Sequence, residues 1–140
     1  MRFHRFSGEH VRRLAPEDHH KLATSEPLTK MVIKVKHYPD WEIFVKRSSG
    51  IRCLDVFQAI FEAFNTPLTP AEKQMLVPSH MRASVEETFR LRCKAWPGLP
   101  DAELAHGWKR VDVLQQATLF LGLTQPQAGG DWMLNLGRST

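Results

Sequence analysis

Two short segments of alternating apolar and charged residues constrain the fold more than any other feature of the chain. In residues 30–36 (KMVIKVK), Met31, Ile33 and Val35 fall on one face and the lysines on the other. Residues 41–46 (WEIFVK) alternate in the same way. A period of two predicts half-buried strands, and the intervening HYPD, residues 37–40, predicts a tight turn. We therefore expect a β-hairpin with one buried face and one basic face.

Helical patterns follow the hairpin. Apolar residues at helical spacing predict a first helix that ends before Pro67. Thr69, a proline and Glu72 form a capping-box pattern that predicts a second helix, ending at about Val77. Steps of four residues predict a third helix over residues 81–96, and the prolines and glycine after it predict a loop over residues 97–107.

Three apolar stretches in the last third of the chain, residues 108–114, 118–121 and 131–136, are typical of strands. The expected fold is α+β, with an antiparallel sheet made of the N-terminal hairpin and the C-terminal strands, packed against about three helices. A hairpin followed by a long helix is also the order found in β-grasp folds. We expect residues 1–22 to form a polar N-terminal arm and residues 23–140 to form a single domain.

The charge is weakly basic and unevenly distributed. Residues 1–50 carry ten Lys and Arg against six Asp and Glu, whereas residues 51–140 carry nine of each. This bias is below that of a dedicated nucleic-acid-binding domain. Neither a membrane-spanning run nor an apolar signal segment is found, which predicts no membrane partner and a cytoplasmic or nuclear location.

Three motifs carry a family resemblance: residues 23–27 (ATSEP), 50–56 (GIRCLDV) and 107–114 (GWKRVDVL). With FLGL at residues 120–123 and Trp132, their order resembles an uncharacterised fungal, largely basidiomycete family, domain-of-unknown-function family 6699. The resemblance covers about four-fifths of the chain. It implies domain boundaries but no activity, cofactor or catalytic residue. Arg52 replaces the family's threonine, so we expect Ser49 to cap the helix instead, or the helix to start later.

Asp112 lies between two valines and has two interpretations. It is half of a carboxylate pair with Asp55, or it forms a structural ion pair with Arg92 or with another arginine of the third helix, Arg82 or Arg90. No base, nucleophile or oxyanion donor accompanies it in sequence, which favours the structural ion pair with Arg92.

Other reactive residues give no catalytic pattern. Cys53 and Cys93 fall on apolar helix faces, which is typical of inert core thiols. The histidines, including His19 and His20, lack metal-ligand spacing. We therefore predict no catalytic residue, metal site or cofactor, and a non-enzyme rather than an enzyme.

The hairpin holds the strongest binding signal. Its lysines and aromatic residues predict an interaction module whose partner is another protein or a second copy of the chain, as in a homodimer. The alternative is nucleic acid, with lysines on phosphates and Phe44 or Tyr38 stacked on a base. Lysines that protect a sheet edge from aggregation give the same pattern. The candidate binding residues are Lys34, Lys36, Tyr38, Trp41, Phe44 and Lys46.

Overall fold

The computed structural model describes residues 21–95 and 98–138. They form two compact units, each described here by itself. Unit 1 comprises residues 21–63 and 118–138, and unit 2 comprises residues 64–117 without the two that are not described. The predicted N-terminal arm lies outside the described residues except for Lys21 and Leu22, and the single domain over residues 23–140 stays a prediction.

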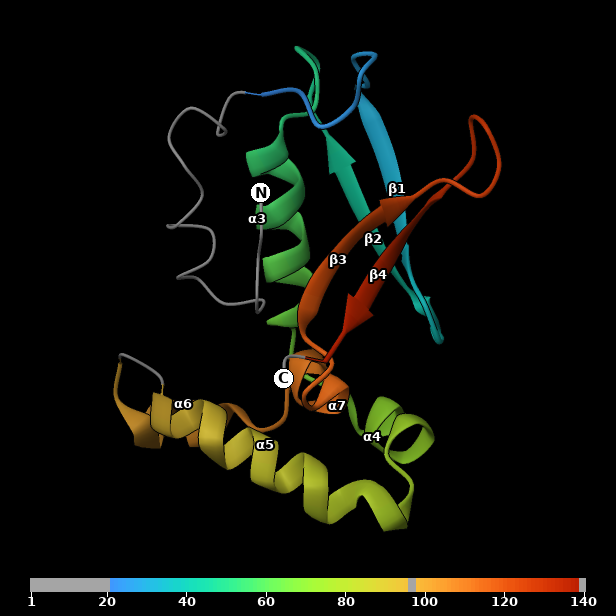
Figure 1. Cartoon of the computed structure of the whole chain (residues 1–140). Coiled ribbons are helices and arrows are strands. Elements are labelled where there is room, and N and C mark those ends of the chain that lie inside the picture. Colours follow the sequence, from blue (N-terminus) through green and yellow to red (C-terminus); the bar gives the residue numbers. More distant parts are fainter. Residues whose placement is uncertain (1–20, 96–97, 139–140) are drawn as a thin grey trace. The chain divides into compact units, whose positions relative to one another are not determined.

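Unit 1 is built on a four-stranded sheet of β1 (Lys30–Val35), β2 (Tyr38–Lys46), β3 (Leu119–Thr124) and β4 (Trp132–Gly137). The strand order is β2-β1-β4-β3 (Figure 1). The outer pairs are antiparallel and the central pair, β1 and β4, is parallel. The α+β prediction is confirmed, although the sheet is mixed.

The turn of the hairpin differs from the prediction. It occupies Lys36 and His37, and β2 already begins at Tyr38, which pairs with Val35. His37 takes a positive φ of 73°, as the second central residue of a type II turn does. Pro39 therefore lies inside β2, which is an edge strand, where a missing N–H does not break the ladder.

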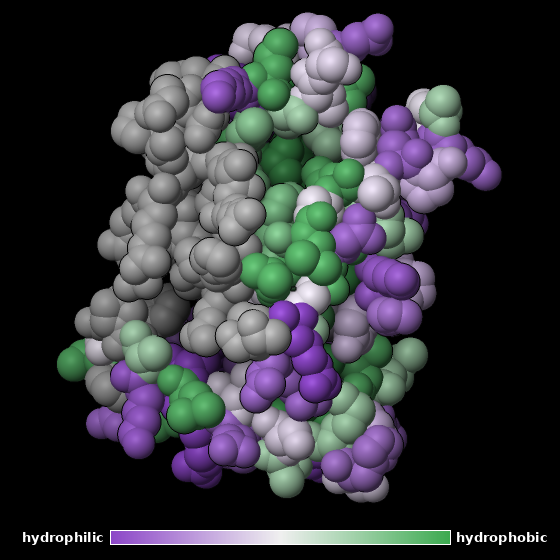
Figure 2. All heavy atoms as spheres, in the orientation of Figure 1, coloured by the Kyte–Doolittle hydropathy of each residue, from purple (hydrophilic) through white to green (hydrophobic). Residues whose placement is uncertain are grey.

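The helix α3 (Cys53–Phe64) lies against the sheet (Figure 1). The Phe57 ring meets the Phe120 ring of β3 edge to face, with centroids 5.0 Å apart. Figure 2 shows apolar side chains at the surface where Figure 1 draws α3 and β3. The predicted alternation of the hairpin is confirmed, because its inward side chains are buried in the core of unit 1: Met31, Ile33, Val35, Trp41, Ile43 and Val45.

The helix α3 starts without a threonine cap, because Arg52 stands at the position where the family that the chain resembles has threonine. The Arg52 backbone N–H donates to the Asp55 carboxylate at 2.8 Å, and its guanidinium binds the same carboxylate at 2.9 and 3.1 Å. Ser49 is not needed, and the helix begins directly after Arg52. The acceptor half of a capping box is thus kept by Asp55 alone.

Unit 2 is helical. The capping box of α4 (Pro70–Leu76) is confirmed, because Thr69 and Glu72 exchange hydrogen bonds of 3.1 and 3.2 Å. A 3₁₀ turn (Ser79–Met81) leads into α5 (Arg82–Ala95). The prediction of a loop over residues 97–107 is wrong for most of that range, which forms the helix α6 (Pro100–His106). The predicted strand over residues 108–114 is also wrong, because most of it is α7 (Arg110–Leu114).

The strand predicted over residues 108–114 does not form, because the Asp112 carboxylate starts a helical turn there. Only Trp108 and its neighbours are extended, where Trp108 and Arg110 pair with residues 66 and 68. At Lys109 the backbone N–H donates to the Asp112 carboxylate at 2.8 Å, which starts a helical turn. A run as short as Val-Asp-Val-Leu fits a strand and a helix equally well by periodicity.

We predict that Asp55→Ala destabilises unit 1 by about 1 kcal/mol, because the Arg52 backbone N–H, directly before α3, and the Arg52 guanidinium lose this acceptor. Arg52→Thr should retain the helix start, since a threonine there completes the capping box with Asp55. Gln58→Ala, at an exposed position of the same helix, is the control. Urea unfolding followed by circular dichroism measures the three variants, and equal losses for Asp55→Ala and Gln58→Ala would contradict the capping role.

Candidate functional site

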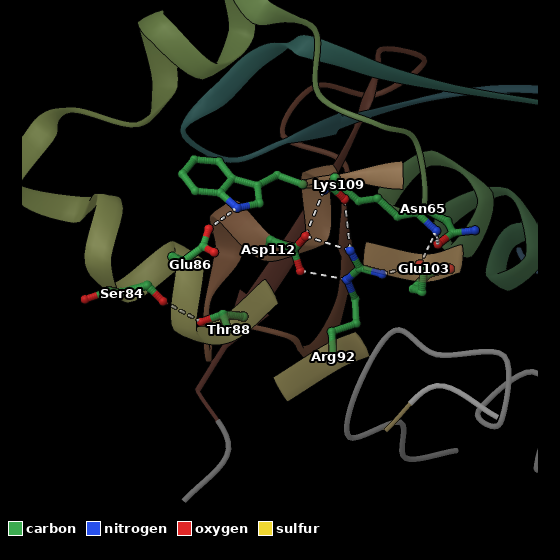
Figure 3. Close-up of polar contacts among 10 residues, drawn as sticks. Asn65, Ser84, Glu86, Thr88, Arg92, Glu103, Lys109 and Asp112 are labelled. Carbon is green, nitrogen blue, oxygen red and sulfur yellow. Dashed lines mark hydrogen bonds and ion pairs between the residues drawn. The ribbon is translucent and has the colours of Figure 1, made fainter. Parts of the chain in front are cut away.

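The most buried charge in unit 2 is Asp112, which is fully buried at the start of α7. Its carboxylate accepts hydrogen bonds from the Arg92 side chain at 2.8 and 3.0 Å, besides the one from the Lys109 backbone (Figure 3). Arg92 also donates to the carbonyl of Gly107 at 3.3 Å. The structure therefore brings together the two residues, Asp112 and Arg92, that the sequence suggested as an ion pair.

Two further charges complete this buried cluster. Glu103 of α6 accepts from the Arg92 guanidinium and, at 2.7 Å, from the Lys109 ammonium. The same ammonium donates to the side-chain carbonyl of Asn65 at 2.9 Å (Figure 3). Two cations thus face two carboxylates, and each carboxylate meets at least one cation. Sequence reasoning missed Glu103 and Lys109, because nothing in their spacing marks them as partners.

The electrostatics of the buried cluster favour its charged form. Burial acts to raise the pKa of Glu103, but hydrogen bonds from Lys109 and Arg92 prevail and hold that pKa below its ordinary value. Burial likewise acts to lower the pKa of Arg92, and Asp112 and Glu103 reverse the effect, so the Arg92 pKa is raised. All the donors and acceptors are directed at one another, which is the arrangement of a structural network.

The other candidate reactive groups are similarly engaged. Burial raises the pKa of the Cys93 thiol, which keeps it protonated and weakly nucleophilic. The Cys53 thiol lies 3.8 Å from the carbonyl oxygen of Leu22. Asp55 is held by Arg52, whose hydrogen bond lowers the pKa of that carboxyl. Within residues 21–95 and 98–138, no three His, Cys, Asp or Glu side chains are grouped to hold a metal ion.

The outward face of the hairpin gathers some of the candidate binding residues and not others. Lys34, Phe44 and Lys46 alternate with the core residues and lie on the face opposite α3. Trp41 points the other way and is buried in the core. The Tyr38 ring stacks on Trp41, with centroids 4.3 Å apart, and burial raises the Tyr38 pKa. Lys36 is exposed in the turn.

The register of β1 and β2 defines the rows of this outward face. Phe44, with 63% of its surface exposed, lies opposite Val32. Lys34 lies opposite Glu42, and the two side chains form an ion pair of 3.2 Å. Lys30 lies directly opposite Lys46, and both are exposed. We call Lys30, Val32, Lys34, Glu42, Phe44 and Lys46 the outer hairpin face.

The family can now be stated. Comparison with known protein families matches residues 1–131 to the family of unknown function DUF6699. The chain belongs to this family. No curated protein and no solved structure matches the chain. Across the described part of the chain, no helix has both the length and the apolar character needed to cross a membrane.

We predict that Arg92→Met destabilises unit 2 by about 3–5 kcal/mol, because Asp112 and Glu103 would stay buried with one cation fewer. Arg90→Met is the matched control on the same helix. Its guanidinium is exposed and pairs with Glu86 at 3.1 Å, so its loss should cost about 0–1 kcal/mol. Urea unfolding measures both, and a loss for Arg92→Met as small as that of the control would show that the buried cluster is dispensable.

A second prediction concerns acid. The folded-state pKa of Glu103 is depressed, so its charged form adds stability above its unfolded pKa, near 4.5. That contribution is lost as the pH falls through the lower folded value. Glu103→Gln should therefore be much less stable than the natural protein near neutral pH, and the gap should narrow as the pH falls below about 4.5. Unfolding curves over this pH range test it, and a constant gap would contradict the ionic role of Glu103.

Proposed function

We propose that this protein is a binding module that recognises a partner protein through the outer hairpin face. The observation that carries the proposal is Phe44. It is a large aromatic residue in the middle of a strand, 63% exposed, and its cross-strand neighbour Val32 is apolar as well. Aromatic side chains are enriched among the residues that anchor protein interfaces.

The surroundings of Phe44 support the same reading. Charged side chains border it on both sides along the strands, as the polar rim of an interface borders its apolar centre. The supporting sheet is rigid, because the inward side chains of both strands are buried. A rigid, exposed anchor loses little conformational entropy on binding.

Nucleic acid is the alternative ligand. Lysines beside an exposed aromatic residue on a sheet are the elements with which some domains bind single strands. Sizing of the purified protein at low and high salt, with absorbance near 260 and 280 nm, distinguishes the two ligands. Co-purifying absorbance at 260 nm that salt removes would support nucleic acid and count against the proposed protein partner. A dimer that Phe44→Ser separates would identify the partner as a second copy of the chain.

We predict that Phe44→Ser abolishes partner binding without unfolding the protein, because the side chain is exposed. The test pans a random peptide library displayed on phage against immobilised natural protein, and measures the affinity of the enriched peptides by fluorescence anisotropy. Phe44→Ser should weaken their binding by at least about tenfold. Leu91→Ser on α5 is the matched control, because Leu91 is 59% exposed and lies in unit 2. If Phe44→Ser leaves the affinity of the enriched peptides unchanged, the proposal is overturned.

A further inference from the structure

The row next to Phe44 on the outer hairpin face carries an electrostatic conflict. Lys30 and Lys46 are directly opposed in the register, and like charges in that position destabilise a strand pair. Within the described ranges, neither ammonium is found in an ion pair, whereas the neighbouring Lys34 is neutralised by Glu42 at 3.2 Å. Arg47 is not part of this row, because it reaches Asp55 at 3.8 Å. Among the residues that the structure describes, Glu42 pairs with one lysine of the face, and the other two have no acidic partner.

Protection of a sheet edge does not explain why Lys30 and Lys46 lie directly opposite each other. Lysines on an edge strand prevent unwanted pairing with other chains, and β2 is an edge strand. Lys46 fits that role. Lys30 precedes the part of β1 that pairs with β4, which runs from Ile33 to Val35, so at Lys30 the register places β2 alone beside β1. Edge protection therefore gives a reason for each lysine, but none for placing the two directly opposite each other, and a ligand that brings negative charge does.

From this pairing we propose that the outer hairpin face binds an acidic peptide segment whose carboxylate lies between Lys30 and Lys46 and whose apolar side chain lies on Phe44 and Val32. The inference rests on the proposed function and names the chemistry of the partner. The lysine row and the Phe44 row are two residues apart along the strands, which is roughly 7 Å. An extended peptide spans that distance between positions i and i+2, so the segment carries an acidic residue two positions from an apolar one.

The charges of the face favour a peptide over a nucleic-acid strand. A nucleic acid carries a phosphate at every nucleotide, and one that runs along the strands from Lys30 and Lys46 would meet the Glu42 carboxylate two rows on. A peptide places its negative charge at the lysine row alone. Phe44 is also the only aromatic side chain on this face, which offers little for successive bases to stack on.

The experiment pans one random peptide phage library in parallel on three baits. They are the natural protein, Lys30→Glu/Lys46→Glu, and the control Arg82→Glu/Lys94→Glu, which makes the same change of net charge at exposed positions of α5. We expect the natural protein and the control to enrich peptides with an acidic residue two positions from an apolar one. Lys30→Glu/Lys46→Glu should lose those peptides and enrich basic ones. Binding of the acidic peptides to the natural protein should weaken as the salt concentration rises.

The outcomes separate this inference from the proposed function. Suppose that the enriched peptides are neutral or basic, and that Phe44→Ser weakens their binding while Lys30→Glu/Lys46→Glu does not. That result would overturn the inference of an acidic partner but not the proposal of a binding module. A shift in charge preference that the control α5 variant also shows would mean that net charge, not this row, selects the peptides, and would overturn the inference. If no enriched peptide depends on Phe44, both proposals fall. If a poly-thymidine oligonucleotide binds more tightly than the peptides, and Lys30→Glu/Lys46→Glu abolishes that binding, the ligand of this face is nucleic acid and the inference of an acidic peptide is overturned.

Discussion

The Arg92 guanidinium is the contact on which the arrangement of unit 2 depends. It extends from α5 to Asp112 at the start of α7 and to Glu103 on α6, so one side chain joins three helices. The helices α6 and α7 have seven and five residues, and helices this short are not stable by themselves in water. Their stability must come from tertiary contacts, and the buried cluster supplies some of these. A buried ion pair is worth little in net energy, but the loss of Arg92 leaves the buried Asp112 without its cation, while Glu103 keeps Lys109.

The same local device appears at the start of two helices in different units. Arg52 to Val56 and Lys109 to Val113 share the pattern of a basic residue, two intervening residues, an aspartate and a valine. In each, the aspartate accepts the backbone N–H of the basic residue three positions earlier. The two differ in what neutralises the aspartate. Asp55 binds the guanidinium of the same basic residue, whereas Asp112 is buried and recruits Arg92 from another helix. The first is a local cap, and the second has become part of the tertiary structure.

This difference explains how far the sequence carried the prediction. Signals that act over a few residues, namely the alternation at Met31 and the capping box at Thr69, predicted the hairpin and α4 correctly. The C-terminal strands were found within a few residues of their ends. The helix α7 was missed because its start depends on Asp112 turning back to Lys109, while the apolar run around it fits a strand equally well. Glu103 and Lys109 could not be assigned to the buried cluster, because only the folded chain brings them to Arg92. Trp41 and Phe44 were both named as binding residues, although the alternation of residues 41–46 already assigns them to opposite faces, and the structure shows Trp41 buried and Phe44 exposed.

The charges of the buried cluster and those of the outer hairpin face differ in how completely they are paired. In the buried cluster of unit 2 two cations and two carboxylates are matched and hydrogen-bonded, so these four charges are engaged with one another and not with a ligand. On the outer hairpin face the charges are exposed and only partly matched, and a large aromatic side chain lies beside the mismatch. A fold optimised for stability alone would place an acidic residue opposite Lys30 or Lys46, as it places Glu42 opposite Lys34. The row of Lys34 and Glu42, two rows away, shows that such a conflict is avoidable, and for this reason the binding proposal rests on the hairpin and not on the buried aspartate.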